Sequence, residues 1–258
     1  MSVRLSRLGL VLLMPFMLVG CLLAPGKFTS TLTINADRTF TYTYNGEVYG
    51  FDMDAAMKDM PTDKKDGASL DKVAFQKAVG QKDDKKGKGD KDGDSEADKS
   101  AAKANNDAEN RALAEKLSKE AGFRKVEYVG NNKFLIDYSI TGKLDHAFLF
   151  PYNLDAGIII PFVAVELRAN GTVRVKAPGF ANEKDSTGGL GGMGPDTSKA
   201  ASKLDGTFTL DTDAELVSQN NEDGAKTANG RTTVTWKANP TTATAPMAVV
   251  RFKDAPAK

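Results

Sequence analysis

The sequence contains one cysteine, Cys21, and one histidine, His146, whose thiol and imidazole could take part in chemistry. Because Cys21 is the only cysteine, the sequence excludes an intrachain disulfide framework and a zinc site built from several cysteines. Asp145 precedes His146, so His146 could in principle act as a general base or a metal ligand. Adjacent residues of a strand point to opposite faces, and we therefore expect these two side chains not to pair. We interpret His146 as an exposed or hydrogen-bonded structural residue, and we predict no catalytic, cofactor-binding or metal-binding residues.

The segment before Cys21 has the order of regions found in a secretory signal. Arg4 and Arg7 form a short basic region, and an apolar run extends from Leu8 to Leu18. Leu18-Val19-Gly20-Cys21 resembles the lipobox of bacterial lipoproteins. That resemblance implies acylation of the Cys21 thiol by palmitate or a similar chain, cleavage before Cys21, and acylation of the new amino group. Residues 1–20 would then be a cleaved signal peptide.

An uncleaved membrane anchor is the competing interpretation of this segment. As a helix, Leu8 to Ala24 would be about 25 Å long, against a hydrocarbon core of about 30 Å. Pro15 also interrupts it, so we expect a lipid anchor at Cys21 that holds the chain in the cell envelope outside the cytoplasm. Two or three acyl chains hold firmly, because each buried methylene adds about 0.8 kcal/mol. Leu22, rather than Asp, follows the cysteine and favours the outer membrane if the organism is Gram-negative.

Composition limits the partners of this chain. It has 258 residues, of which 40% are hydrophobic and 27% charged, with a formal net charge of +1. Removal of residues 1–20 would take away two arginines and no acid, which leaves the net charge slightly negative. Such a balance supplies no strong field for nucleic acid, so we predict no nucleic-acid partner. The length suits one domain with loose segments or two small domains, and the oligomeric state stays open.

Strict alternation of side chains marks a β-hairpin near the N-terminus. Phe28 to Asn35 and Thr39 to Tyr44 each place apolar residues on one face and threonines on the other, around a polar turn. Phe40, Tyr42 and Tyr44 form an aromatic stripe, which we expect to be core beneath a helix that contains Leu113 and Leu117.

Three helices are expected, at Asp52 to Met60, Ser69 to Val79 and Asn106 to Ala121. Asn106 and Glu109 make a capping-box pattern at the start of the third helix. Two segments, at about 81–105 and 182–204, are expected to be loose insertions, because their Lys, Asp and Gly-rich compositions bury little apolar surface.

Each loose segment contains a partial binding motif. Asp90, Asp92 and Asp94 resemble a calcium loop, but Ser95 and Ala101 occupy the positions that require Gly and Glu. We therefore predict a solvated linker there. The glycines that begin at Gly189 spell G-x-G-x-x-G without the buried strand and helix that a dinucleotide site requires. We predict no cofactor from either motif.

The remaining strands are predicted from alternation between turn signals, of which Asn170-Gly171 is the strongest. They are Phe123 to Val129, Lys133 to Ile140, Ile158 to Leu167, Thr172 to Lys176, Thr207 to Leu210, Leu216 to Ser218, Thr232 to Trp236 and Met247 to Phe252.

Several of these features together resemble the LppM-like bacterial lipoproteins. They are Cys21-Leu22 before a threonine-rich hairpin, the helix from Asn106 with strands after it, and the segments Ala214 to Asn220 and Gly230 to Trp236. The resemblance covers most of the mature chain except the two loose segments. It implies an envelope lipoprotein with a weak indication of lipid or partner binding, and it transfers no functional residue beyond Cys21.

We predict one α+β domain over residues 21–258, with a mainly antiparallel sheet covered by two or three helices. The predicted function is a membrane-tethered, non-enzymatic binding module for a lipid, a glycan or an envelope protein. A structural or assembly lipoprotein and a carboxylate-dependent hydrolase are the alternatives. A large apolar cavity between helix and sheet would favour the first, a flat apolar patch the second, and two facing carboxylates in a cleft the third.

Overall fold

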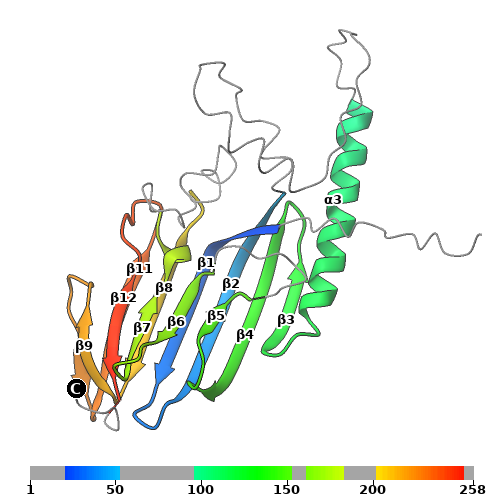
Figure 1. Ribbon diagram of the computed structural model, residues 1–258. Helices are drawn as coiled ribbons and strands as arrows, with labels where there is room; N and C mark the ends of the chain where they lie inside the picture. The colour runs from blue at the N-terminus through cyan, green and yellow to red at the C-terminus, as the bar shows by residue number, and fades with distance from the viewer. Residues whose placement is uncertain (1–20, 53–95, 153–160, 183–201, 253–258) are drawn as a thin grey trace, which may run out of the picture.

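A computed structural model describes residues 21–52, 96–152, 161–182 and 202–252, which form two β-sheets and one long helix (Figure 1). The larger sheet has seven strands in the order β10-β11-β8-β1-β2-β4-β3, and the smaller has five in the order β5-β6-β7-β12-β9. The elements are β1 (Cys21–Ile34), β2 (Thr39–Asp52), α3 (Glu96–Leu117), β3 (Phe123–Tyr128), β4 (Lys133–Lys143), β5 (Phe148–Phe150), β6 (Val163–Leu167), β7 (Thr172–Lys176), the 3₁₀ turn η1 (Pro178–Phe180), β8 (Asp205–Thr212), β9 (Glu215–Gln219), β10 (Lys226–Ala228), β11 (Arg231–Ala238) and β12 (Met247–Arg251).

The hairpin of β1 and β2 forms the centre of the seven-stranded sheet. Its antiparallel register pairs Ile34 with Phe40 at the turn and extends to Cys21 opposite Asp52. β4 pairs with the outer edge of β2, and β8 lies parallel to the other edge of β1. Alternation puts the apolar side chains of all these strands on one face, and threonines on the other.

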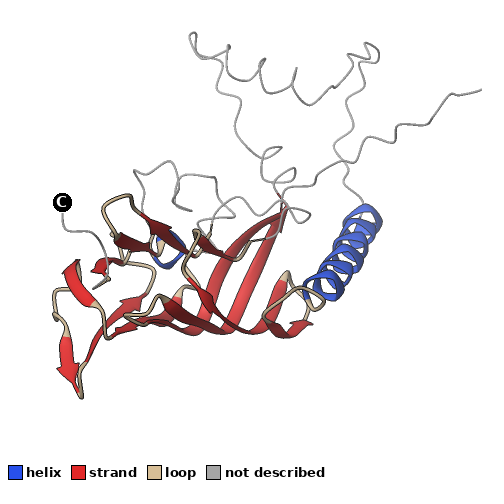
Figure 2. Ribbon diagram, turned by 60° about the horizontal axis from the view of Figure 1, so that its bottom comes forward, coloured by secondary structure: helices blue, strands red, loops and turns tan. Residues whose placement is uncertain are grey.

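The five-stranded sheet covers the apolar face of the seven-stranded one, and most of the core lies between them (Figure 2). Aromatic side chains from both sheets meet there. The ring centroid of Tyr42 lies 5.0 Å from that of Phe150, and Tyr44 lies 5.9 Å from Phe162. Burial of large aromatic side chains supplies much of the free energy that holds the sheets together.

Helix α3 stands beside β3, at one edge of the larger sheet (Figures 1 and 2). Its buried residues Asn110, Ala114 and Leu117 recur at helical spacing, while the residues between them are mostly exposed. Asn110 donates to Asn132 at 3.1 Å, and Tyr128 of β3 hydrogen bonds to Asp107. The helix therefore docks on the β3–β4 hairpin through a narrow stripe.

The predicted fold class was wrong, because a second sheet, and not a layer of helices, covers the core. Among the described residues only α3 is a long helix. The aromatic stripe of Phe40, Tyr42 and Tyr44 faces the second sheet, so its expected position beneath Leu113 and Leu117 was also wrong. The physical reason is that β5, β6, β7 and β12 belong to a second sheet with an apolar face of its own. Packed against the larger sheet, this face buries more apolar surface than one narrow helix can.

Most predicted strands are present, and their lengths differ. The hairpin is longer than expected, and β5 and β10 were not predicted. Helix α3 begins at Glu96, before the expected cap at Asn106. The helices expected at 52–60 and 69–79 lie outside the described residues, apart from Asp52 at the end of β2. The partial dinucleotide motif also lies outside them. Of the partial calcium motif, only Ala101 is described, and it is part of α3.

Candidate functional site

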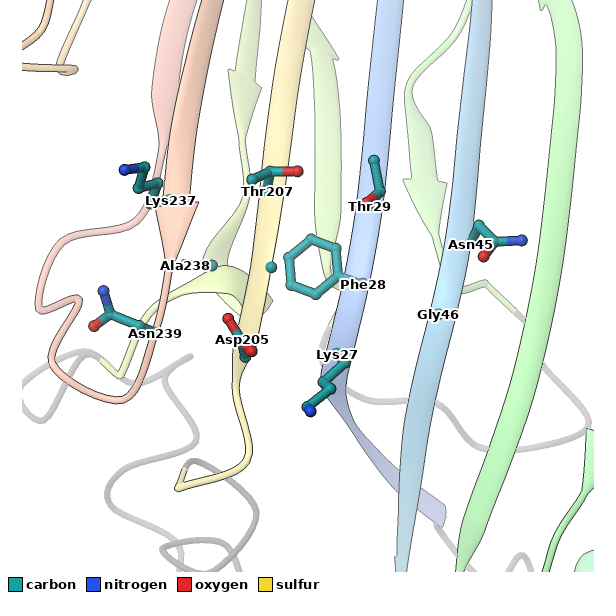
Figure 3. Close-up of a pocket in the computed structure, with 11 residues that line it drawn as sticks. Lys27, Phe28, Thr29, Asn45, Gly46, Asp205, Thr207, Lys237, Ala238 and Asn239 are labelled. Carbon is teal, nitrogen blue, oxygen red and sulfur yellow. The ribbon is translucent and has the colours of Figure 1, made fainter.

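A shallow pocket of about 580 Å³ lies on the threonine-bearing side of the seven-stranded sheet (Figure 3). Strands β1, β2, β8 and β11 and the residue after β11 line it. The lining residues are Lys27, Phe28, Thr29, Asn45, Gly46, Asp205, Gly206, Thr207, Lys237, Ala238 and Asn239. The lining combines two lysines, one carboxylate, two amides and two hydroxyls, all of which are groups that can donate or accept hydrogen bonds.

Phe28 and two glycines, Gly46 and Gly206, also line this pocket. Phe28 pairs with Gly46 of β2 on one side and with Gly206 of β8 on the other. A Cβ atom at Gly46 would lie 2.5 Å from the Phe28 Cβ, and one at Gly206 would lie 2.4 Å from its Cδ1. Both positions therefore require glycine, because the Phe28 ring, which is 6% exposed and stacks on Phe180 in the core, fills the space that their side chains would take.

The polar side chains of the pocket are positioned by regular strands and one turn. Lys27 and Asp205 are register partners, as are Thr29 and Thr207. Asn239 is oriented by a local turn, in which its Oδ1 accepts hydrogen bonds from the backbone N–H and the hydroxyl of Thr241 at 2.9 and 2.6 Å.

A charged cluster extends the site along β2 toward Asp52. Lys133 donates to Glu47 Oε1 at 3.1 Å, the hydroxyl of Tyr49 donates to Glu47 Oε2 at 3.2 Å, and the ammonium of Lys203 lies 4.0 Å from the Tyr49 ring centroid. Partial burial alone would raise the pKa of Glu47. The hydrogen bond and positive charge of Lys133, together with the hydrogen bond from Tyr49, outweigh burial and hold this pKa below its usual range. The pair with Glu47 raises the pKa of Lys133.

Sequence reasoning found none of the pocket residues. Cys21, the one predicted site residue, is the first residue of β1, and nothing is described of its thiol. Asp145 and His146 do pair with each other, so the expectation that they would not was wrong. They lie in the turn between β4 and β5, where strand alternation does not apply, and both are exposed.

Pocket residues could have been suspected from one signal, the glycines at 46 and 206 inside alternating strands. Their meeting at Phe28 depends on the parallel pairing of β1 with β8, which joins segments far apart in sequence. In the described residues no group of three or more His, Cys, Asp or Glu side chains could hold a metal ion. No helix in the same part of the chain is long and apolar enough to cross a membrane.

Comparisons with known proteins give one structural neighbour to report. No protein-family model matches the chain, and no curated protein matches it significantly. A solved structure that it resembles is the NMR structure of the folded domain of LppM from Mycobacterium tuberculosis. The TM-score is 0.31 and the identity 16%, with 90% of this chain and 92% of that chain covered. A likeness at this level carries no argument about function.

Proposed function

We propose that this chain is a membrane-tethered lipoprotein of the cell envelope, which acts as a non-enzymatic binding module for a glycan. The pocket between Lys27 and Asn239 is its binding site, and acylated Cys21 is its tether. The observation that carries the proposal is the pocket lining, which gathers hydroxyl, amide, ammonium and carboxylate groups from four neighbouring strands and the residue after β11. Sugars present hydroxyl groups that both donate and accept, and such a mixed lining matches them.

The form of the pocket favours a glycan over the other ligand classes considered. A lipid tail requires an apolar cavity, whereas this lining is rich in polar side chains. Two facing carboxylates would support hydrolysis, and the lining contains only Asp205. A structural or assembly role would call for a flat apolar patch on the surface. The large apolar side chains exposed in the described residues are scattered over separate elements, apart from two on the neighbouring strands β9 and β12, and do not favour such a patch. They are Val129, Tyr152, Val217 and Met247.

Saturation-transfer NMR on the full-length lipoprotein in detergent micelles tests this proposal with glucose, N-acetylglucosamine and their disaccharides as probes. We expect transfer to at least one sugar, and loss of that signal in the Lys237→Ala/Asn239→Ala variant, whose side chains line the pocket. Lys119→Ala, an exposed lysine beyond the end of α3, is the matched control and should bind normally. Absence of transfer to every probe, or equal loss in both variants, would refute the proposed site.

A further inference from the structure

Five hydroxyl groups form a row across the outer face of the seven-stranded sheet. They belong to Ser139, Thr43, Thr31, Thr209 and Thr235, one from each of β4, β2, β1, β8 and β11. The strand registers place each directly opposite the next, since Thr43 pairs with Ser139 and Thr31, and Thr209 pairs with Thr31 and Thr235. All five residues are half-buried or exposed, and none carries a charge. We call these five residues the hydroxyl row.

The hydroxyl row runs beside the pocket. A second row lies two residues away along four of the same strands and lines the pocket. It consists of Asn45, Thr29, Thr207 and Lys237. We call it the pocket row. Figure 3 shows Thr29 and Thr207 side by side on β1 and β8 in this second row. Residues two apart in a strand are about 6.7 Å apart, so the two rows border one path across the sheet.

Several hydroxyls along this path are available to a ligand. Thr209 and Thr235 hydrogen bond to each other at 3.1 Å. The hydroxyls of Thr29, Thr31 and Thr207 have no hydrogen-bond partner among the residues that the structure describes. Each threonine also presents a methyl group beside its hydroxyl, which matches the mixed polar and apolar surface of a sugar ring.

The other outer face of the molecule has a different character. There the five-stranded sheet carries charged pairs, Arg174 with Glu166 at 2.7 Å and Arg251 with Glu215 at 3.2 Å. The outer face of the seven-stranded sheet also carries charged pairs, Lys133 with Glu47 and Arg231 with Asp211, but both lie outside the hydroxyl row. The hydroxyl row is therefore an uncharged strip on the face that holds the pocket.

We propose that one flexible, uncharged polysaccharide chain lies across the strands between the hydroxyl row and the pocket row. This inference rests on the proposed function and names the ligand of the same site more closely. Five strands about 4.8 Å apart give a path about 19 Å long, which exceeds a single sugar. Successive strands turn by roughly 20–25°, so the path turns by about 80–100°. A rigid crystalline surface cannot follow that twist, whereas a single chain with rotatable linkages can.

Isothermal titration of the full-length lipoprotein in micelles tests the inference with neutral oligomers of glucose and of N-acetylglucosamine, from one to eight units. We expect affinity for one series to rise with length over the first few units. Thr31→Val/Thr209→Val keeps the side-chain shape and removes two hydroxyls, and it should weaken the longest oligomer about tenfold or more. It should leave the monosaccharide affinity unchanged.

Thr227→Val is the matched control, because Thr227 pairs its hydroxyl with that of Thr232 at 3.2 Å on β10 and β11, outside the hydroxyl row. This variant should bind every oligomer normally. Affinity independent of length, or equal binding by the wild type and Thr31→Val/Thr209→Val, overturns the extended path and leaves the pocket intact. Absence of binding by every oligomer, monomers included, overturns both the path and the proposed function.

Discussion

At the scale of single residues, the packing beneath the pocket depends on Phe28, which has glycine on both neighbouring strands. The ring of Phe28 covers backbone at Gly206 and stacks on Phe180, with centroids 4.2 Å apart. Close packing leaves the ring no room to retreat, since interiors are as dense as organic crystals. A single methyl group added at Gly206 should therefore lower the stability of the fold.

Gly206→Ala should lower the free energy of unfolding by about 1–3 kcal/mol, the usual cost of overpacking a filled site. The physical cause is the 2.4 Å approach of the new Cβ to Phe28 Cδ1. Urea denaturation measures it. Phe28→Leu in the same chain should relieve part of that cost, so the two substitutions should be non-additive in a double-mutant cycle. Strict additivity would show that the contact is not the cause.

The Glu47–Lys133 pair predicts a pH dependence. The pKa of Glu47 is depressed, so its contribution is present above the unfolded-state pKa and is lost as pH falls through the folded-state value. The raised pKa of Lys133 places the loss of its contribution at alkaline pH. Glu47→Gln should therefore lower the melting temperature at about pH 7, and the difference from wild type should shrink at about pH 3.

Thermal melts followed by circular dichroism at both pH values would measure this difference. Glu115→Gln, on the exposed side of α3, is the control and should melt like the wild type at each pH. A Glu47→Gln difference that stays constant or grows as the solution is acidified would contradict the assigned ion pair.

At the scale of elements, the local sequence pattern predicted most of the strands, but it did not predict that a second sheet covers the core. The β1–β2 hairpin and the turn at Asn170-Gly171 follow from alternation and turn chemistry, which are local properties. The second sheet depends on β12 pairing with β7 and β9, and the pocket on β8 pairing with β1. No short-range signal encodes those pairings, and so both the fold class and the site escaped prediction.

Helix α3 docks on the β3–β4 hairpin through a narrow stripe, and Leu117 is its most buried large side chain at 2% exposure. Leu117→Ala should cost about 2–5 kcal/mol of stability, as expected for a cavity at a buried leucine. Lys116→Ala, at the exposed neighbouring position, should cost little. Chemical denaturation compares the two variants. Equal midpoints for both would contradict the docking of α3 through this stripe.

At the scale of the whole molecule, the tether and the pocket share one strand. Cys21 begins β1 and Lys27 lies six residues along it, so the pocket is about 20 Å from the proposed acylation site. Because Cys21 is register-paired with Asp52, acylation there would hold this end of the sheet close to the membrane surface. A binding site so placed would meet envelope polymers close to the bilayer.

Cys21→Ser should abolish incorporation of a palmitate analogue and leave the precursor uncleaved, because the thiol is the acceptor that the lipobox resemblance implies. Metabolic labelling in the native host measures it. Asn45→Ala, a pocket variant with Cys21 intact, should be labelled like the wild type. Label that persists in Cys21→Ser would exclude the tether.

The central claim, that the outer face of the larger sheet binds an envelope glycan, is tested most directly by photo-crosslinking in intact cells. A photoreactive amino acid at position 45 lies in the pocket lining, and one at position 251 lies exposed on the five-stranded sheet. We predict glycan-bearing adducts, identified by mass spectrometry, from position 45 and none from position 251. Adducts from position 251 alone, or only protein adducts from position 45, would contradict the account.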